Sequence, residues 1–438
     1  MKFEVLKRSH LKRNIIIGVI VIAAISALVL NYTRAKYRTA ESMPLINGTI
    51  NYDLADLNTV AVYIEDETAT DGYAKADTIP TSGYTFNEEM SYCSIDGNRD
   101  DSITLSYDMM MQALSVTPLT TKGTKCYLYF DEQPAIKDTL LAYYPTVLTR
   151  SDFSTTVTDT TTGTIYKSAD ESQYDNDGEV YYFAGNPTDN WVSFAGYYWR
   201  IIRVNGDGTI RLIYNGTNIE TIYLQSTASS SVFNSSYDNN AHVGYMYTIE
   251  ELHGIKTSST VKGILDTWYI NNLLNYGKVI DDNAGFCGDR TPYSGTGIGS
   301  GTNLTYYEAY NRLYTNKEPT YSCSNNNDLY TASSSNKGNK ALTYPVGLIT
   351  ADEVAYAGGV YGSNNINFYL YSEPAYWTMT PSNCMITSSV FYVTSYGNIN
   401  PSTVNTSYIL RPVINLKADV TISSGNGTST QPFVIATS

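Results

Sequence analysis

The side chains that most often carry catalysis are scarce in this sequence or lack their usual neighbours. Only three histidines occur in 438 residues, and neither His242 nor His253 is accompanied by the GxSxG motif that positions a nucleophilic serine. The HExxH spacing of metalloproteases is also absent. Because an isolated histidine without such partners is usually structural, we predict no enzyme, no catalytic residue and no cofactor.

Acidic residues are abundant, but their spacing does not reveal an acid–base pair. Asp352 and Glu353 follow Thr350, which matches a capping box at the start of a helix, where the helix dipole favours acidic side chains. Sequence neighbours do not show whether two carboxyls face each other across a cleft, as glycoside hydrolysis requires. The run Asp175-Asn176-Asp177-Gly178 lacks the other ligands of an EF-hand, so we predict a turn and no metal site.

Tyrosine, asparagine, serine and threonine are the residue types that indicate a function. The chain has 41 tyrosines, and tyrosine offers a large, rigid contact while serine and asparagine add adaptable hydrogen bonds, as in antibody loops. The competing interpretation is solvated strand positions, which have a similar composition in exported β-proteins. We expect a ligand-binding face near the C-terminus, with these candidates: Tyr392, Tyr396, Asn398, Asn400, Asn405 and Tyr408.

An apolar segment near the N-terminus predicts on which side of the membrane this binding face lies. Residues 15–32 are uncharged and long enough to span a bilayer. Five basic residues precede the segment and three follow it, which predicts a cytoplasmic tail at 1–14 and an extracellular chain beyond the helix. A cleaved signal peptide is the alternative. We expect a single-pass plasma-membrane protein with a polar stalk at 33–47.

The charge distribution excludes one class of partner. Residues 1–40 hold eight of the 28 basic residues and one of the 42 acidic ones, so the remainder holds 20 against 41, a net charge of −21. Such an acidic chain repels phosphate backbones, and we expect no nucleic acid among its partners.

Five cysteines fit an exported chain with disulfides. Their order along the chain suggests that Cys93 pairs with Cys126 and Cys287 with Cys323, which leaves Cys384 over. Zinc is the alternative, but no pair has CxxC spacing.

Strand and turn signals divide the exported part into segments. Short β-type runs at 60–64, 84–86, 103–107 and 126–130 predict a small immunoglobulin-like β-sandwich over residues 48–132, with a disulfide across the sandwich. A Thr- and Ser-rich stretch at 133–180 is predicted to be a linker or a peripheral ribbon.

Residues 181–438 show a mixed pattern. The segment 191–214 predicts a three-stranded meander with Gly-containing turns. Ser259 or Thr260 can cap a helix, and both Thr305 with Glu308 and Thr350 with Glu353 match capping boxes. Strands follow to the C-terminus. The whole chain is therefore predicted to be α+β, mostly β, with an antiparallel sheet in its last domain.

The last third of the chain resembles a known family. The segments YWTMTP at 376–381, Val390–Val393 and RPVINL at 411–416 resemble the closing half of C-type-lectin-like domains, closest to the Tyr/Asn/Ser-rich ligand-binding domains that retroelements diversify in bacterial surface proteins. The resemblance implies a C-type-lectin-like domain over 181–438, in which Trp377 packs under the terminal sheet, the Arg-Pro strand closes that sheet, and residues 382–408 form the binding surface. The calcium signature of animal lectins is absent, because Glu373-Pro374 is followed by Ala375.

These observations predict a membrane-anchored extracellular binding or adhesion protein that recognises a glycan, peptide or protein ligand. Two alternatives stay open, a cell-wall polysaccharide-acting enzyme and a structural envelope protein without catalysis.

Overall fold

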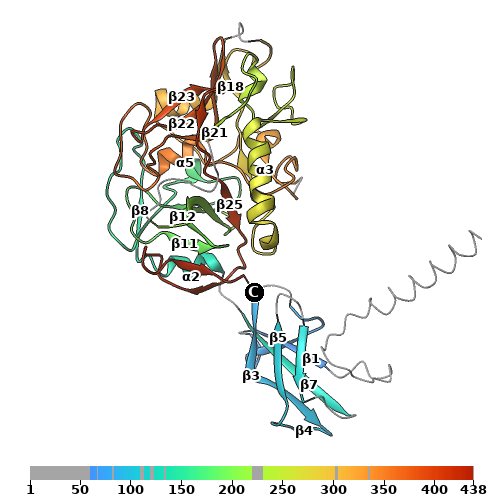
Figure 1. The fold of residues 1–438 in the computed structure, drawn as a ribbon. Coiled ribbons are helices and arrows are strands. Elements are labelled where there is room, and N and C mark those ends of the chain that lie inside the picture. The colour runs from blue at the N-terminus through green and yellow to red at the C-terminus, as the bar shows by residue number, and fades with distance from the viewer. Residues whose placement is uncertain are drawn as a thin grey trace, which may run out of the picture. The chain divides into compact units, whose positions relative to one another are not determined.

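The chain beyond residue 59 forms two compact units, which divide between Gln133 and Pro134 (Figure 1). The structure, a computed structural model, describes residues 60–66, 68–80, 83–108, 113–118, 123–132, 135–219, 230–300, 304–333 and 336–437. With 38% strand and 13% helix, the fold is α+β and mostly β, which confirms the predicted class. The predicted tail, anchor and stalk lie outside the described residues, and no helix within those ranges is long and apolar enough to cross a membrane.

The first unit is built from a five-stranded sheet and a hairpin. The sheet has the order β2 (Tyr73–Ala76), β1 (Val60–Glu65), β7 (Thr124–Glu132), β3 (Tyr84–Ile95) and β4 (Asn98–Arg99), and the hairpin joins β5 (Thr104–Asp108) to β6 (Ala113–Thr117). The β1–β7 pair is parallel and the other pairs are antiparallel. Alternation along the strands turns Leu128 and Phe130 toward Leu105 and Leu114 of the hairpin, and all four are buried.

The disulfide of this unit lies within one sheet. Cys93 and Cys126 are bonded, as predicted, but they are direct register partners on β3 and β7, with Cα atoms 3.9 Å apart. The prediction of a bridge across a sandwich was therefore wrong. Strand order explains the error, because it places β7 beside β3 in the same sheet, and spacing along the chain does not show which strands are neighbours.

The outer face of this sheet carries a row of tyrosines. Tyr92 stacks on Tyr127, with ring centroids 4.8 Å apart, and Tyr63 stacks on Tyr129 at 4.9 Å. Tyr73 completes the row with its ring edge toward Tyr129, at 5.0 Å. Cross-strand aromatic pairs of this kind stabilise a sheet by about 0.2–1 kcal/mol each.

The second unit holds two larger sheets. The first has the order β26 (Ile422–Ser424), β27 (Phe433–Ile435), β11 (Trp191–Phe194), β12 (Tyr197–Val204), β10 (Tyr181–Tyr182), β9 (Thr164–Lys167) and β8 (Thr146–Thr149), and β13 (Ile210–Gly216) joins β12 to β25 (Val413–Leu416). The second has the order β18 (Pro292–Ser294), β19 (Thr305–Tyr307), β21 (Tyr376–Cys384), β22 (Ser388–Val393) and β23 (Ile399–Thr403). Short strand pairs link the loops: β14 (Ser231–Val232) with β24 (Ser407–Tyr408), β15 (Met246–Tyr247) with β16 (Thr257–Ser258), and β17 (Phe286–Cys287) with β20 (Leu329–Tyr330).

The predicted meander is confirmed. β11, β12 and β13 are consecutive antiparallel strands, and Ala195 and Gly196 have φ values of 55° and 78° in the tight turn between the first two. Two positive φ values in succession are what a two-residue hairpin turn of this hand requires.

Four α-helices, with one π-helical turn, are described in the second unit: α2 (Ile136–Leu141), α3 (Thr260–Asn272), α4 (Glu308–Tyr310), which the π-helical turn Asn311–Asn316 continues, and α5 (Ala351–Tyr356). Ser259 caps α3 as predicted, and Thr350 with Glu353 forms the predicted capping box of α5. The second predicted capping box was wrong. Thr305 lies in β19, and Tyr307 precedes α4 without a side-chain cap.

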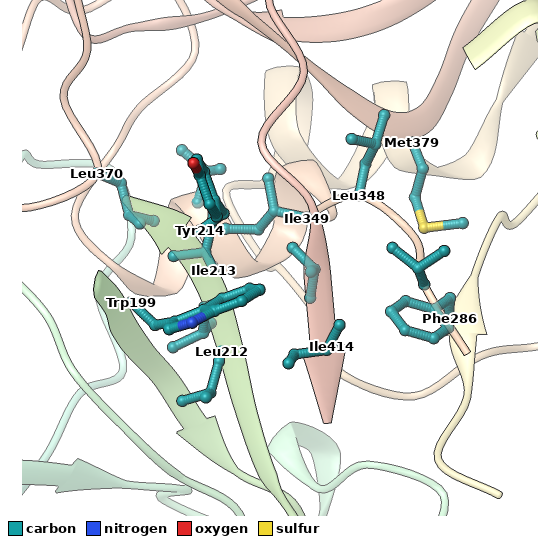
Figure 2. Close-up of a cluster of buried hydrophobic side chains, with 14 of the residues drawn as sticks. Trp199, Leu212, Ile213, Tyr214, Phe286, Leu348, Ile349, Leu370, Met379 and Ile414 are labelled. Carbon is teal, nitrogen blue, oxygen red and sulfur yellow. The ribbon is translucent and has the colours of Figure 1, made fainter. Parts of the chain in front are cut away.

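One hydrophobic core joins the two sheets. Figure 2 shows Trp199 and Leu212 of β12 and β13 in the same cluster as Ile414 of β25 and Met379 of the second sheet. Trp199 is fully buried, and burying a large aromatic side chain contributes about 1.5–3 kcal/mol. The core therefore fixes the position of the second sheet against the first.

The predicted linker at 133–180 is wrong as a linker. Its residues form α2, β8 and β9, and β9 pairs with β10, so the segment continues the first sheet to its edge. Buried Ile136, Tyr144 and Ile165 tie it to the main core. The polar composition of the segment did not indicate these strands, because a few buried apolar residues are enough to pack an edge strand against the core. The alternative interpretation as a peripheral ribbon agrees with the structure.

Candidate functional site

The predicted binding residues lie at the end of the second sheet, where three of the six come together. Tyr392 of β22 is the register partner of Asn400 on β23, so both side chains lie on one face. The Tyr392 ring stacks on Tyr408 of β24, with centroids 4.3 Å apart and planes 11° apart. Both tyrosines remain partly exposed. The Tyr408 hydroxyl lies 3.2 Å from that of Ser402, which adds a polar group to this aromatic face.

The aromatic face rests on a rigid base. Trp377 is fully buried, and its ring meets that of Tyr408 edge to face, with centroids 4.9 Å apart. Its indole nitrogen donates a hydrogen bond of 2.9 Å to the carbonyl of Ser231, which fixes the ring. Burial, followed by the hydrogen bond with Tyr408, raises the pKa of Tyr392 to about 12. The phenol therefore stays protonated at neutral pH and can donate to a ligand.

The other three candidates lie apart from this pair. Tyr396 is 62% exposed in the turn between β22 and β23, and Asn405 is exposed in the turn before β24. Asn398 is buried, donates to Asn364 at 2.6 Å and accepts from Thr394 at 2.9 Å. The amide of Asn398 thus holds the turn in place and lies apart from the aromatic pair. Its role as a ligand-binding residue stays a prediction.

The strand after Arg411 differs from what the resemblance implies. β25 pairs with β13 and so completes the first sheet, whereas the second sheet ends at β23. Arg411 is buried and donates to the carbonyls of Tyr214 and Leu370. The Arg-Pro segment thus connects the two sheets and does not close the terminal one.

A second site lies in the same unit, where charged side chains surround a small polar cavity. Arg203 of β12 and Arg211 of β13 are register partners, and both are buried. Like charges directly opposite each other destabilise a sheet unless a counter-charge holds them. Glu353 supplies it, with one carboxylate oxygen 3.1 Å from Nε of Arg203 and 2.6 Å from Nε of Arg211. Asp175 adds a further contact to Arg203 at 3.2 Å.

The electrostatics of the two arginines differ. Burial lowers the pKa of Arg211 to about 10, against the opposing effect of Glu353. Burial acts in the same direction on Arg203, but Glu353 and Asp175 together raise its pKa above the ordinary value. Both guanidiniums are therefore charged at neutral pH.

Other residues that line this cavity are also ionic. Arg312 bridges Asp289 at 2.8 Å and Asp352 at 3.1 Å, and Lys337 contacts Asp177 at 2.5 Å. The cavity has a volume of about 40 Å³. Because a water molecule needs about 10–15 Å³ measured in this way, there is room for about three.

This site was not predicted from the sequence. Glu353 was expected in the capping box, which is correct, since its other oxygen accepts a hydrogen bond from the backbone nitrogen of Thr350 at 2.8 Å. The same side chain has a second role that capping does not indicate. The available signal was the presence of Arg203 and Arg211 inside strands that are otherwise buried and apolar, because a buried charge needs a partner.

The remaining reactive side chains have structural surroundings. His253 lies 2.8 Å from Asp328, whose carboxylate also holds buried Arg290 at 2.6 Å. Cys287 and Cys323 form the predicted disulfide. Cys384 is a buried thiol whose sulfur accepts a hydrogen bond from the hydroxyl of Ser388 at 3.7 Å. Within the described ranges, no three or more His, Cys, Asp or Glu side chains are placed so that together they could hold a metal ion.

Comparison with known proteins adds no relative: no family model, curated protein or solved structure matches this chain.

Proposed function

We propose that the chain is an extracellular binding or adhesion protein, anchored in the plasma membrane by residues 15–32, whose second unit recognises a glycan, peptide or protein. The observation that carries the proposal is the stacked pair Tyr392 and Tyr408 on the buried Trp377. A rigid base removes most of the entropy cost of ordering aromatic side chains on binding, and the partly exposed edges leave hydroxyl groups for hydrogen bonds.

The neighbouring residues support the same function. Asn400 and Ser402 add an amide and a hydroxyl beside the aromatic pair, and exposed Tyr396 extends the contact area from the adjacent turn. Aromatic anchors surrounded by small polar groups are typical of protein and carbohydrate interfaces. The net charge of −21 beyond residue 40 argues against nucleic acid as the ligand.

The proposal includes a fold assignment. We take the first unit as an immunoglobulin-like β-sandwich and the second as a C-type-lectin-like domain that begins at about residue 134. The support is the hairpin packed on the five-stranded sheet in the first unit, and the YWTMTP and RPVINL segments in the second. A common architecture of this kind hosts many functions, so the site carries the functional argument.

Binding is tested with the full-length chain on glycan and peptide arrays, followed by affinity measurements on the ligand found. Tyr396→Ala and Asn400→Ala should each weaken binding about fivefold or more, as for an interface residue worth about 1 kcal/mol. Tyr293→Ala is the matched control, because Tyr293 is 56% exposed on β18, away from the site. Equal affinities for all variants would refute the site, and cleavage of an arrayed glycan would indicate an enzyme instead.

The location is tested on intact cells that express the chain. Protease added outside should degrade the two units, and Cys93 and Cys287 should resist thiol reagents because both are in disulfides. A chain that stays intact under protease while a surface control is cleaved would contradict the extracellular location.

A further inference from the structure

The cavity between Arg203 and Arg211 has hydrogen-bond donors that the protein itself does not use. Arg203 donates through Nε to Glu353 and through Nη1 to Asp175. Arg211 donates through Nη1 to the carbonyl of Gly285 at 3.1 Å, and its Nε lies 2.6 Å from Glu353 as an ion pair without hydrogen-bond geometry. The Nη2 group of each arginine donates no hydrogen bond within the described residues. Both side chains are more than nine-tenths buried, and both line the cavity.

A guanidinium nitrogen that faces a cavity and makes no hydrogen bond within the protein gains from an acceptor placed there. A hydrogen bond to a charged group contributes about 1.5–3 kcal/mol. Two such donors come from register partners that share one oxygen of Glu353, so they face the same small space. A carboxylate, with two oxygens in a plane, is the natural acceptor for a pair of guanidiniums.

The charge of the lining decides which kind of carboxylate fits. The cations are Arg203, Arg211, Arg312 and Lys337, and the anions are Asp175, Asp177, Asp289, Asp352 and Glu353, which is four against five. A simple anion would add to this negative excess. A molecule that carries an ammonium beside its carboxylate would not, and Asp177, an exposed carboxylate of the lining that also contacts Lys337 at 2.5 Å, can receive the ammonium.

We propose that this cavity binds a small α-amino acid in its zwitterionic form, with the carboxylate on Nη2 of Arg203 and Arg211 and the ammonium toward Asp177. The space for about three water molecules admits a ligand the size of glycine or alanine, and larger side chains would have to project outward. This site is separate from the aromatic face of Tyr392 and Tyr408 and does not depend on the function proposed for it.

The test is calorimetric titration of the full-length chain with glycine and alanine. Glycinamide and alaninamide are the matched ligands without a carboxylate, and acetate is the one without an ammonium. We expect saturable binding of the amino acids and at least tenfold weaker binding of the amides and of acetate. Absence of amino-acid binding, or equal binding of amides or acetate, would overturn the proposal.

Variants separate ligand binding from folding. Arg211→Lys keeps a positive charge for Glu353 but removes the Nη2 donor, so glycine should bind at least tenfold more weakly. Arg290→Lys is the control, because Arg290 is equally buried but spends Nε, Nη1 and Nη2 on Asp328 and Gly254, outside the cavity. Its glycine affinity should be unchanged.

A variant at Asp177 keeps the test decisive if the buried arginine variants do not fold. Asp177→Asn changes an exposed carboxylate, and it should weaken glycine severalfold without affecting the unfolding midpoint by more than a surface substitution does. A glycine affinity equal to that of the unmodified chain would contradict the assignment of the ammonium position.

Discussion

Replacing Glu353 with glutamine should destabilise the second unit by about 3–5 kcal/mol. The Glu353 side chain is 2% exposed, and its Oε1 atom is the counter-charge that Arg203 and Arg211 share. Removing one partner of a buried ion pair costs about 3–5 kcal/mol, because the remaining charge stays buried without compensation. Glu353→Gln keeps the volume and an amide oxygen that can still accept from Thr350, so the loss reports the charge.

The assay is thermal unfolding followed by circular dichroism and tyrosine fluorescence. For a unit of this size about 1 kcal/mol shifts the thermal midpoint by roughly 2 °C, so a loss of about 3–5 kcal/mol should lower it by roughly 6–10 °C. Glu318→Gln is the control, because Glu318 is exposed and its substitution should stay within about 0.5 kcal/mol.

A double substitution tests the cause. Arg211→Met in the Glu353→Gln background removes one of the two facing cations, so it should restore part of the lost stability. A Glu353→Gln loss no larger than that of the Glu318 control, or a further loss on adding Arg211→Met, would refute the reasoning that the two arginines depend on this carboxylate.

Three further predictions follow from the cysteines and one aspartate. Replacing Cys287 and Cys323 with alanine opens a loop with a sequence separation of 36, which should cost about 4 kcal/mol in chemical unfolding by the chain-entropy relation. Burial raises the pKa of the Cys384 thiol, so iodoacetamide at pH 8 should label it in urea but not in the native chain, and rapid native labelling would contradict its burial. Burial opposes ionisation of Asp328, but the His253 hydrogen bond and the Arg290 charge together lower its pKa below 3.8. Because the pKa of Asp328 is lower in the folded chain than in the unfolded one, this stabilisation is complete above about pH 4 and is lost as the pH falls through the folded pKa. Asp328→Asn should therefore make the free energy of unfolding less dependent on pH on the acid side. An unchanged pH dependence would contradict this prediction.

Local patterns predicted the elements with short-range causes. The turn at Ala195-Gly196, the cap at Ser259 and the capping box at Thr350 depend on residues within a few positions of each other, and all three are confirmed. The capping prediction at Thr305 failed because pairing with Cys384 of β21 draws that residue into a strand. Tertiary pairing there outweighs a local signal worth about 1 kcal/mol.

The candidate residues of the aromatic face were predicted in part. Residue type alone indicated Tyr392, Asn400 and Tyr408, which the hairpin and the β14–β24 pair bring to one place. Residue type could not show that Asn398 turns inward, since a buried and an exposed asparagine look alike in a polar segment. The contact of Tyr408 with Trp377 likewise needed the folded chain.

The sequence by itself determined the acidic balance, the mostly β class and the meander at 191–214, because composition and short-range periodicity decide these features. The order of the cysteines suggested the two disulfide pairs, which the structure confirms. Only the tertiary structure decided that residues 136–180 belong to the second unit, that Cys93 and Cys126 lie in one sheet, and that Glu353 joins two arginines. These features bring together side chains up to 150 positions apart, as Arg203 and Glu353 are. Such contacts are fixed by burial of the whole core and not by any local pattern.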